Sequence, residues 1–253
     1  MQYLLGILRH MLMEFLGVGV RSGDDDWLLH RVCVHLERPQ LVVVLSAVAE
    51  QRRAMLDVAA GRIIPLEGRV WVSGRPLARH TLADIRSRVI EADPRMSVST
   101  GRSLVWNTLA AGPYGIGSAL LRLPRARHRK AAIDALAEVD LRGQAQRPAG
   151  LLEAEERVRL ALAGALARSP ECMVLKDLDL AVDLGGATGL LTLLKRVARR
   201  REILVLASLA SATLAGQFAD RILALADGLL VFDGSPARYA ERRPTLEVTR
   251  ASS

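Results

Sequence analysis

The 253-residue sequence has little cysteine and few aromatic residues, and both shortages exclude classes of protein. Two cysteines, Cys33 and Cys172, are too few for a disulfide-stapled scaffold or for a zinc site with the usual ligand spacing. Both lie in apolar runs, which predicts buried, reduced thiols. Aromatic residues make up 4% of the chain, so a stacking surface for single-stranded nucleic acid is not expected. The five histidines are scattered and predict no metal site.

The chain also has little lysine, although its net charge is +8. Only Lys130, Lys176 and Lys195 occur, so arginine supplies nearly all of the positive charge. Such a surface can meet phosphates or an anionic membrane. The sequence offers no reading helix and no aromatic platform, and we predict no nucleic-acid partner. Half of the residues are hydrophobic, which allows a sizeable core and excludes wholesale disorder.

No run of the sequence is apolar and long enough to be expected to cross a membrane. The apolar start of the chain is interrupted by Arg9, His10 and Glu14, and it lacks a basic leader and a small-residue cleavage site. We therefore expect a cytoplasmic chain. Residues 1–12 form an extension with leucines at helical spacing, which either docks on a partner or membrane surface or packs on its own domain.

Short apolar runs typical of β-strands recur along the chain. The early runs alternate and are joined by short turns, which predicts antiparallel pairs. LVVVL, CMVL and ILVLA are almost wholly apolar, as parallel strands covered on both faces are. The expected strands are 13–20, 31–36, 41–46, 69–74, 88–90, 172–175, 203–207, 221–226 and 229–234.

Helical patterns separate these strands and dominate the middle of the chain. Strands, a helical insertion and then strand–helix–strand indicate an α/β core with an inserted helical subdomain. We assign residues 13–92 and 166–253 to the core and residues 93–165 to the helical insertion. The expected helices are 51–60, 128–139, 153–168 and 186–200.

Four stretches in this order resemble the nucleotide-binding domain of ABC transporters, over roughly residues 13–240. They are LVVVLSAVAEQRRAMLDVAAGRIIPLEGRVWVSGRPL, ADIRSRVIEADPRM, ERVRLALAGALARSPECMVL and FADRILALADGLLVFDGSP. The resemblance implies a P-loop ATPase-like core, in which a mixed sheet carries an antiparallel part, with an inserted α-helical subdomain.

The phosphate-binding loop of that family needs G-x-x-x-x-G-K-[ST], because glycine lets backbone amides close on phosphates. Here Ser46 and Gln51 replace the glycines, and Glu50 would place a carboxylate in the phosphate cradle. Arg52 replaces the lysine as a forked cation, and Arg53 cannot bind magnesium through a hydroxyl. The resemblance therefore implies a degenerate P-loop.

The Walker B strand should end in Asp-Glu, where the first residue serves the metal and the second polarises water. The ungapped alignment places Lys176 and Asp177 there. In an alternative register Asp177 is the metal ligand and Leu178 replaces the base, but this needs a gap before Asp183. Asp183 matches the aspartate of the D-loop. Either register lacks one carboxylate that phosphoryl transfer requires.

The remaining family motifs are also replaced. The Q-loop glutamine falls on Ala92, the switch histidine on Ser208 and the adenine-stacking aromatic residue on Ser22. Three carboxylates in the signature position would repel a phosphate at a helix N-terminus. The aligned signature residues are Leu152, Glu153, Ala154, Glu155 and Glu156.

Lys176 stands at the end of a buried strand, where a charge needs a partner. Asp177, Glu50 and Asp179 are the candidates in sequence. We expect Arg52, Arg53 and Lys176 to hold Asp177 and Glu50 in an internal ion network that fills the former nucleotide site.

These substitutions imply a non-catalytic subunit, a pseudoenzyme with a structural or regulatory role in a membrane transport complex. The alternative is a nucleotide-sensing regulatory subunit that binds ATP weakly without hydrolysis. No cofactor is expected, with ATP and magnesium binding weak at best. The expected partners are a transmembrane permease subunit, a competent ABC ATPase subunit, or both, with the chain peripheral to the inner face of the cell membrane.

In the family, a groove between the core and the helical insertion receives a short helix of the membrane subunit. The matching stretch here holds a tryptophan, which is either an interface anchor or a core residue. The candidate groove residues are Met96, Leu104, Val105, Trp106 and Leu109.

Overall fold

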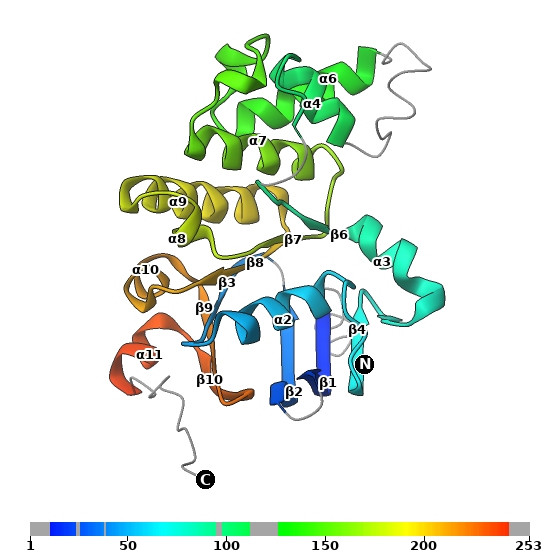
Figure 1. The fold of residues 1–253 in the computed structure, drawn as a ribbon, viewed down its shortest axis with the longest axis vertical. Coiled ribbons are helices and arrows are strands. Elements are labelled where there is room, and N and C mark those ends of the chain that lie inside the picture. Colours follow the sequence, from blue (N-terminus) through cyan, green and yellow to red (C-terminus); the bar gives the residue numbers. More distant parts are fainter. Residues whose placement is uncertain (1–10, 24–25, 38, 95–97, 112–125, 243–253) are drawn as a thin grey trace, which may run out of the picture.

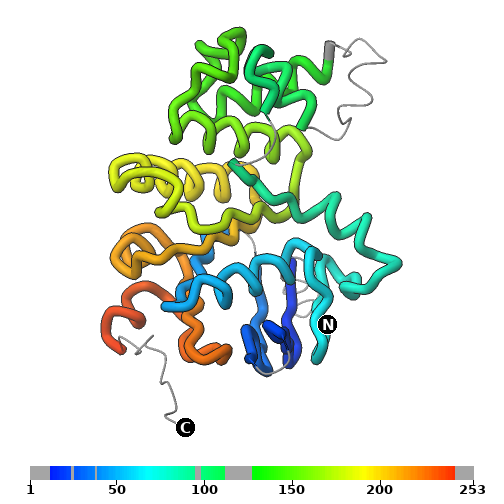
Figure 2. The backbone as a smooth tube through the Cα atoms, in the orientation of Figure 1, coloured from blue at the N-terminus to red at the C-terminus, as the bar shows by residue number. Residues whose placement is uncertain are grey.

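A computed structural model of the chain shows two β-sheets with helices arranged in layers around them (Figure 1). In the same orientation, the backbone trace shows the helical segment of residues 126–166 at one end of the molecule and the antiparallel sheet towards the other (Figure 2). The structure describes residues 11–23, 26–37, 39–94, 98–111 and 126–242.

The smaller sheet has four antiparallel strands in the order β2-β1-β4-β5. Met11 pairs with Glu37, so Met11 and Leu12 belong to the first strand and not to an extension. Residues 1–10 of the predicted extension lie outside the described residues. The strands are β1 (Met11–Ser22), β2 (Asp26–Glu37), β4 (Glu67–Val72) and β5 (Arg75–Pro76).

The larger sheet has six strands in the order β10-β9-β3-β8-β7-β6, and all its pairs are parallel except β9 with β10. Along β3, Leu41 and Val43 enter one buried core, whereas Val42 and Val44 enter the other. An apolar run without alternation is therefore buried on both faces. The strands are β3 (Gln40–Leu45), β6 (Val89–Glu91), β7 (Cys172–Leu175), β8 (Leu204–Leu209), β9 (Arg221–Ala226) and β10 (Leu229–Gly234).

Helices cover both faces of the six-stranded sheet (Figure 1). Helix α2 (Ala49–Ala59) packs between the two sheets, with Met55 and Leu56 fully buried in the core that they share. Helix α9 (Leu184–Arg201) packs on the opposite face through Leu190 and Leu194. The other helices of this part are α3 (Leu82–Arg88), α8 (Leu178–Ala181), α10 (Ala212–Phe218) and α11 (Pro236–Arg242).

Three helices form a separate layer at one end of the molecule, beyond α9 (Figure 1). They pack on one another through apolar faces that include Leu104, Leu136 and Leu162. They are α4 (Leu104–Ala111), α6 (Ala126–Glu138) and α7 (Ala154–Leu166), and short 3₁₀ segments lie at Arg79–Thr81, Arg142–Gln144 and Ala149–Leu151. The predicted α/β fold with a mixed sheet, an antiparallel part and helices is confirmed.

The prediction of buried, reduced thiols is confirmed for Cys172 and wrong for the exposed Cys33. Cys172 is buried in β7, where burial raises the pKa of its thiol. Cys33 is exposed, because its neighbours Val32 and Val34 point into the core and the pleat turns Cys33 outward. Its sulfur accepts a hydrogen bond from the amide of Gly17 at 3.1 Å.

Over the described ranges, no helix combines the length and apolar character that crossing a membrane requires. The same residues contain no group of three or more His, Cys, Asp or Glu side chains placed to hold a metal ion.

Candidate functional site

The loop between β3 and α2 is held by its own side chains. The Ser46 hydroxyl donates to Gln51 Oε1 at 2.8 Å and accepts from the amide of Val48 at 3.1 Å. Arg52 folds back over the loop and donates from Nη1 to the Ser46 carbonyl at 2.5 Å. The positions aligned with the two P-loop glycines thus bond to each other, and a guanidinium lies on the loop backbone.

Asp177 lies beyond the end of β7 and joins three elements. Arg52 of α2 contacts its Oδ1 at 3.2 Å, and Arg53 contacts its Oδ2 at 2.5 Å. Ser208 of β8 accepts from the Asp177 amide at 2.8 Å and donates to Oδ1 at 3.2 Å. We call Ser46, Gln51, Arg52, Arg53, Asp177 and Ser208 the internal ion network.

Asp177 adopts a left-handed backbone conformation with φ of 48°, which aspartate tolerates better than most residues. Arg52 and Asp177 are each 3% exposed. Burial acts to raise the pKa of Asp177, but its hydrogen bond to Arg53 and the charges of Arg53 and Arg52 outweigh burial and hold that pKa below its usual range. The carboxylate is therefore ionised at neutral pH.

Lys176 does not join this network. Its Nζ contacts Asp57 Oδ1 at 2.5 Å and Glu91 Oε1 at 3.2 Å, and Arg62 pairs with both carboxylates. Arg53 and Asp57 are four residues apart on α2, so Asp177 and Lys176 meet successive turns of one helix face. The predicted partners of Lys176 are therefore wrong.

The other two predicted partners of Lys176 are engaged elsewhere or lie at the surface. The Asp179 carboxylate accepts from the amides of Ala210 and Ser211. Glu50 lies exposed in the first turn of α2 and has no ion pair among the described residues, although its charge helps to raise the pKa of Arg53 after the larger effect of Asp177. Glu50 thus stands beside the network and not within it.

We expect Lys176→Met to lower the free energy of unfolding by about 1–3 kcal/mol, because Asp57 and Glu91 lose a shared cation in a mostly buried place. Urea unfolding measures this loss. The matched control is Lys130→Met, whose ammonium pairs with Asp134 on the exposed surface of α6 and should be worth about 0.2–1 kcal/mol. Equal effects of the two substitutions would contradict a structural role for Lys176.

Two of the three carboxylates at the signature position, Glu155 and Glu156, form ion pairs within the chain. Glu153 caps α7, and the Glu156 side chain accepts from the Glu153 amide at 3.1 Å. Glu156 also pairs with Arg147, and Glu155 pairs with Arg159 at 2.7 Å. The charges of Glu155 and Glu156 are thus balanced within the chain, and the repulsion of a phosphate by three carboxylates stays a prediction. Leu152 is buried and Ala154 exposed at the same helix start.

The remaining aligned positions are spread over the fold. Ala92 is buried after β6 and donates its amide to the Val174 carbonyl at 2.9 Å. Asp183 caps α9 and accepts from the amide of Gly186 at 2.7 Å. Ser22 lies exposed at the end of β1. Of the positions aligned with the Q-loop, D-loop, A-loop and H-loop, only the last, Ser208, belongs to the network.

Sequence reasoning missed an aromatic residue in the β1–β2 hairpin, Trp27, which pairs with Arg21, the neighbour of Ser22. The Trp27 ring stacks on His30 with centroids 4.9 Å apart, and the Arg21 guanidinium lies 4.3 Å from its centroid. These contacts engage the Trp27 ring within its own chain.

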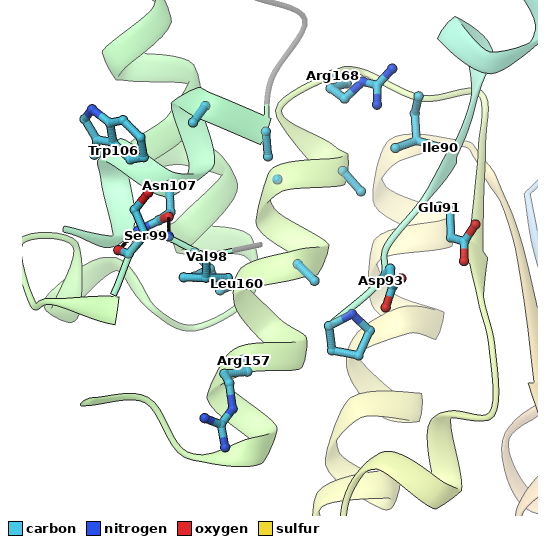
Figure 3. Close-up of a pocket in the computed structure, with 16 residues that line it drawn as sticks. Ile90, Glu91, Asp93, Val98, Ser99, Trp106, Asn107, Arg157, Leu160 and Arg168 are labelled. Carbon is cyan, nitrogen blue, oxygen red and sulfur yellow. Dashed lines mark hydrogen bonds between the residues drawn. The ribbon is translucent and has the colours of Figure 1, made fainter. Parts of the chain in front are cut away.

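The candidate groove residues separate into core and cavity positions. Leu104 and Val105 are buried, Leu109 packs against the core, and Met96 lies outside the described residues. Trp106 is half-buried and lines a cavity of about 110 Å³ between α4, α7 and the segment after β6. Figure 3 shows Trp106 on one side of α7, and Glu91 and Asp93 on the other.

Comparisons with known proteins give consistent relatives. The chain is 30% identical over 234 residues to the cobalt import ATP-binding protein CbiO of Rhodobacter capsulatus, covering 90% of this chain and 78% of that protein. It is 29% identical over 215 residues to the phosphonates import ATP-binding protein PhnC of Thiobacillus denitrificans, covering 84% and 83%. No family model matches.

Solved structures agree on the fold. The structure of cbiO1 from Clostridium perfringens, part of the ABC transporter complex cbiONQ, superposes with a TM-score of 0.81. That match has 16% identity and covers 92% of both chains. A nucleotide-free ATP-binding cassette from an ABC transporter superposes with a TM-score of 0.77 at 13% identity, covering 92% of this chain and 94% of that one.

These relatives overturn one prediction. The chain was expected to be no enzyme, a pseudoenzyme with degenerate ATPase motifs. Its relatives are named as ATP-binding import proteins of transporters, a class of ATPases, and they match over most of their length. The absence of motif residues at aligned positions does not outweigh that similarity, and the prediction is wrong.

Proposed function

This chain belongs to the family of ABC transporter ATP-binding proteins, and we propose that it acts in a membrane transport complex as the subunit with a structural and regulatory role. We place it at the inner face of the cell membrane, where it contacts a transmembrane permease subunit, a second ATP-binding subunit, or both. The observation that carries the proposal is the internal ion network, in which Arg52 bonds to the phosphate-binding loop and, with Arg53, pairs with Asp177.

The network bears on nucleotide affinity. Phosphates entering the loop would have to displace Arg52 from the Ser46 carbonyl and from Asp177. Moving Arg52 would break one of the two arginine ion pairs that the described residues give the buried Asp177, which is costly. The isolated chain therefore binds Mg-ATP weakly, and partners that loosen the network would strengthen binding.

The residues present fit magnesium poorly. Arg53 and Lys176 stand where a hydroxyl and a carboxylate would hold the ion, and both are cations. Asp177 directs both carboxylate oxygens to arginines.

The cavity beside Trp106 supports a permease contact. A half-buried tryptophan at the mouth of a small cavity is a common anchor for a partner side chain. Arg102 lies 5.6 Å from the centroid of the ring and borders the same surface.

The test is co-purification from detergent-solubilised membranes of cells that produce the tagged chain. We expect a membrane-spanning protein, an ATP-binding protein, or both, in fixed stoichiometry with the chain. Recovery of the chain alone, from membranes of cells that also produce the permease and the second ATP-binding subunit, would contradict the proposal.

A further inference from the structure

The beginning of helix α6 carries a cluster of exposed cations. Arg127, Arg129 and Lys130 all lie exposed, and no carboxylate stands in the first turn of this helix. In the sequence, Arg122 and Arg125 shortly precede the helix, outside the described residues. We call Arg127, Arg129 and Lys130 the basic start of α6.

Cations at this end of a helix work against its dipole. The unpaired amides of a helix N-terminus carry partial positive charge, so acidic side chains stabilise that end and basic side chains stabilise the other. Two long helices of this chain follow the rule, with two glutamates in the first turn of α7 and three arginines in the last turn of α9. The arginine-rich composition of the chain therefore does not by itself explain the basic start of α6.

Local contacts leave most of this positive charge unbalanced. Lys130 pairs with Asp134 at 2.9 Å, but 79% of the Lys130 side chain is exposed, and such surface pairs are weak. Arg127 donates to Nε2 of His128 at 3.1 Å, a contact that leaves the charge of the guanidinium in place. Arg129 forms no ion pair within the described ranges. The cluster therefore presents net positive charge to its surroundings.

The basic start of α6 belongs to the helical layer at one end of the molecule (Figure 1). Leu136 of α6 and Leu104 of α4 share one buried core, and α4 carries Trp106, the proposed anchor for the permease. A layer that contacts a permease stands close to the membrane surface, and the cytoplasmic leaflet is anionic. The charge of the cluster is thus complementary to the surface that this layer would meet.

We propose that the basic start of α6 binds the anionic lipid headgroups beside the permease. The choice of a membrane as the partner rests on the proposed function, because charge alone would also suit an acidic protein. Each lysine or arginine close to an anionic leaflet strengthens binding by roughly fivefold. Such a contact is weak and reversible by itself, and it adds to the permease contact because both sites are on one chain.

The test is sedimentation of the purified full chain with vesicles of phosphatidylcholine, either pure or with about 30% phosphatidylglycerol, at about 0.1 M salt. We expect binding to the anionic vesicles alone, with loss at about 0.5 M salt because charges are then screened. Arg127→Gln combined with Arg129→Gln should weaken binding roughly 25-fold. The matched control, Arg199→Gln with Arg200→Gln, removes the same charge from the exposed end of α9 and should weaken binding less than about threefold.

The variant of α6 should melt at or above the wild-type temperature, since it removes charges that oppose the helix dipole, so unfolding would not explain lost binding. No binding to anionic vesicles, equal binding to neutral vesicles, or equal weakening by the two double variants would overturn the proposal. Soluble polyglutamate that binds through the same two arginines more tightly than the vesicles do would indicate an acidic protein partner, and would also overturn it. These arms contain no permease, so they can fail while the co-purification that tests the proposed function succeeds.

Discussion

Asp177→Asn is expected to lower the free energy of unfolding by about 3 kcal/mol or more, since it leaves the buried Arg52 without a counter-ion. Asparagine keeps the side-chain shape and tolerates the left-handed backbone, so lost charge dominates the effect. Among the described residues, Asp177 is the carboxylate that pairs with Arg52, and the buried Arg52 Nε already lacks a hydrogen-bond partner. The variant therefore offers Arg52 no replacement for the lost charge. Urea unfolding at pH 7 measures the change.

A double-mutant cycle separates the ion pair from general damage. Arg52→Met combined with Asp177→Asn should recover much of the stability, because removing both charges also removes the buried uncompensated one. Asp134→Asn, which breaks only an exposed pair with Lys130, is the surface control. Additive losses in the double variant would show that Arg52 and Asp177 are not coupled.

The ion pair between Arg52 and Asp177 predicts that the free energy of unfolding depends on pH. The pKa of Asp177 is depressed in the folded chain, so its contribution is complete above the ordinary aspartate pKa of about 4 and is lost as pH falls through the folded value. The stability difference between wild type and Asp177→Asn should therefore shrink below about pH 4.

Trp106→Ala is expected to weaken binding of the membrane partner by about 2 kcal/mol or more, roughly 30-fold, since tryptophans at cavities are typical interface anchors. Quantitative pull-down of the solubilised complex measures the change. Trp71→Ala is the matched control, a half-buried tryptophan on β4 of the antiparallel sheet. Unchanged partner recovery with Trp106→Ala, in a variant whose fold is intact by circular dichroism, would contradict the role of Trp106 as an anchor for the membrane partner.

Much of the fold follows from patterns in the sequence. The runs CMVL, RILALA and LLVFDG coincide with β7, β9 and β10, because apolar strands bounded by turn residues leave few alternatives. Alternation along β2 predicts its inward valines, yet Cys33 was assigned to the core from its apolar neighbours. The alternation along β2 by itself predicts that Cys33 faces outward.

The site was less predictable, because charge pairing depends on which helix faces meet. Sequence placed Arg52 and Arg53 near Asp177, since a loop after one strand and the end of a nearby parallel strand share one edge of the sheet. It did not indicate Asp57 or Glu91 as partners of Lys176. The separation of Asp57 and Glu91 from Lys176 along the chain does not show that these side chains come close in the fold. Only the pairing of β6 with β7, which end together, brings Glu91 near Lys176.

We infer that Arg52 occupies the phosphate-binding loop while it and Arg53 hold Asp177, which opposes nucleotide binding. Titration calorimetry with Mg-ATP tests it most directly, comparing wild type with a variant that restores the family loop (Ser46→Gly, Gln51→Gly, Arg52→Lys and Arg53→Ser). We predict a wild-type dissociation constant near millimolar or weaker, and binding at least about tenfold tighter in the restored loop, provided that its melting curve shows a folded protein. Micromolar binding of Mg-ATP by the wild-type chain would contradict the account.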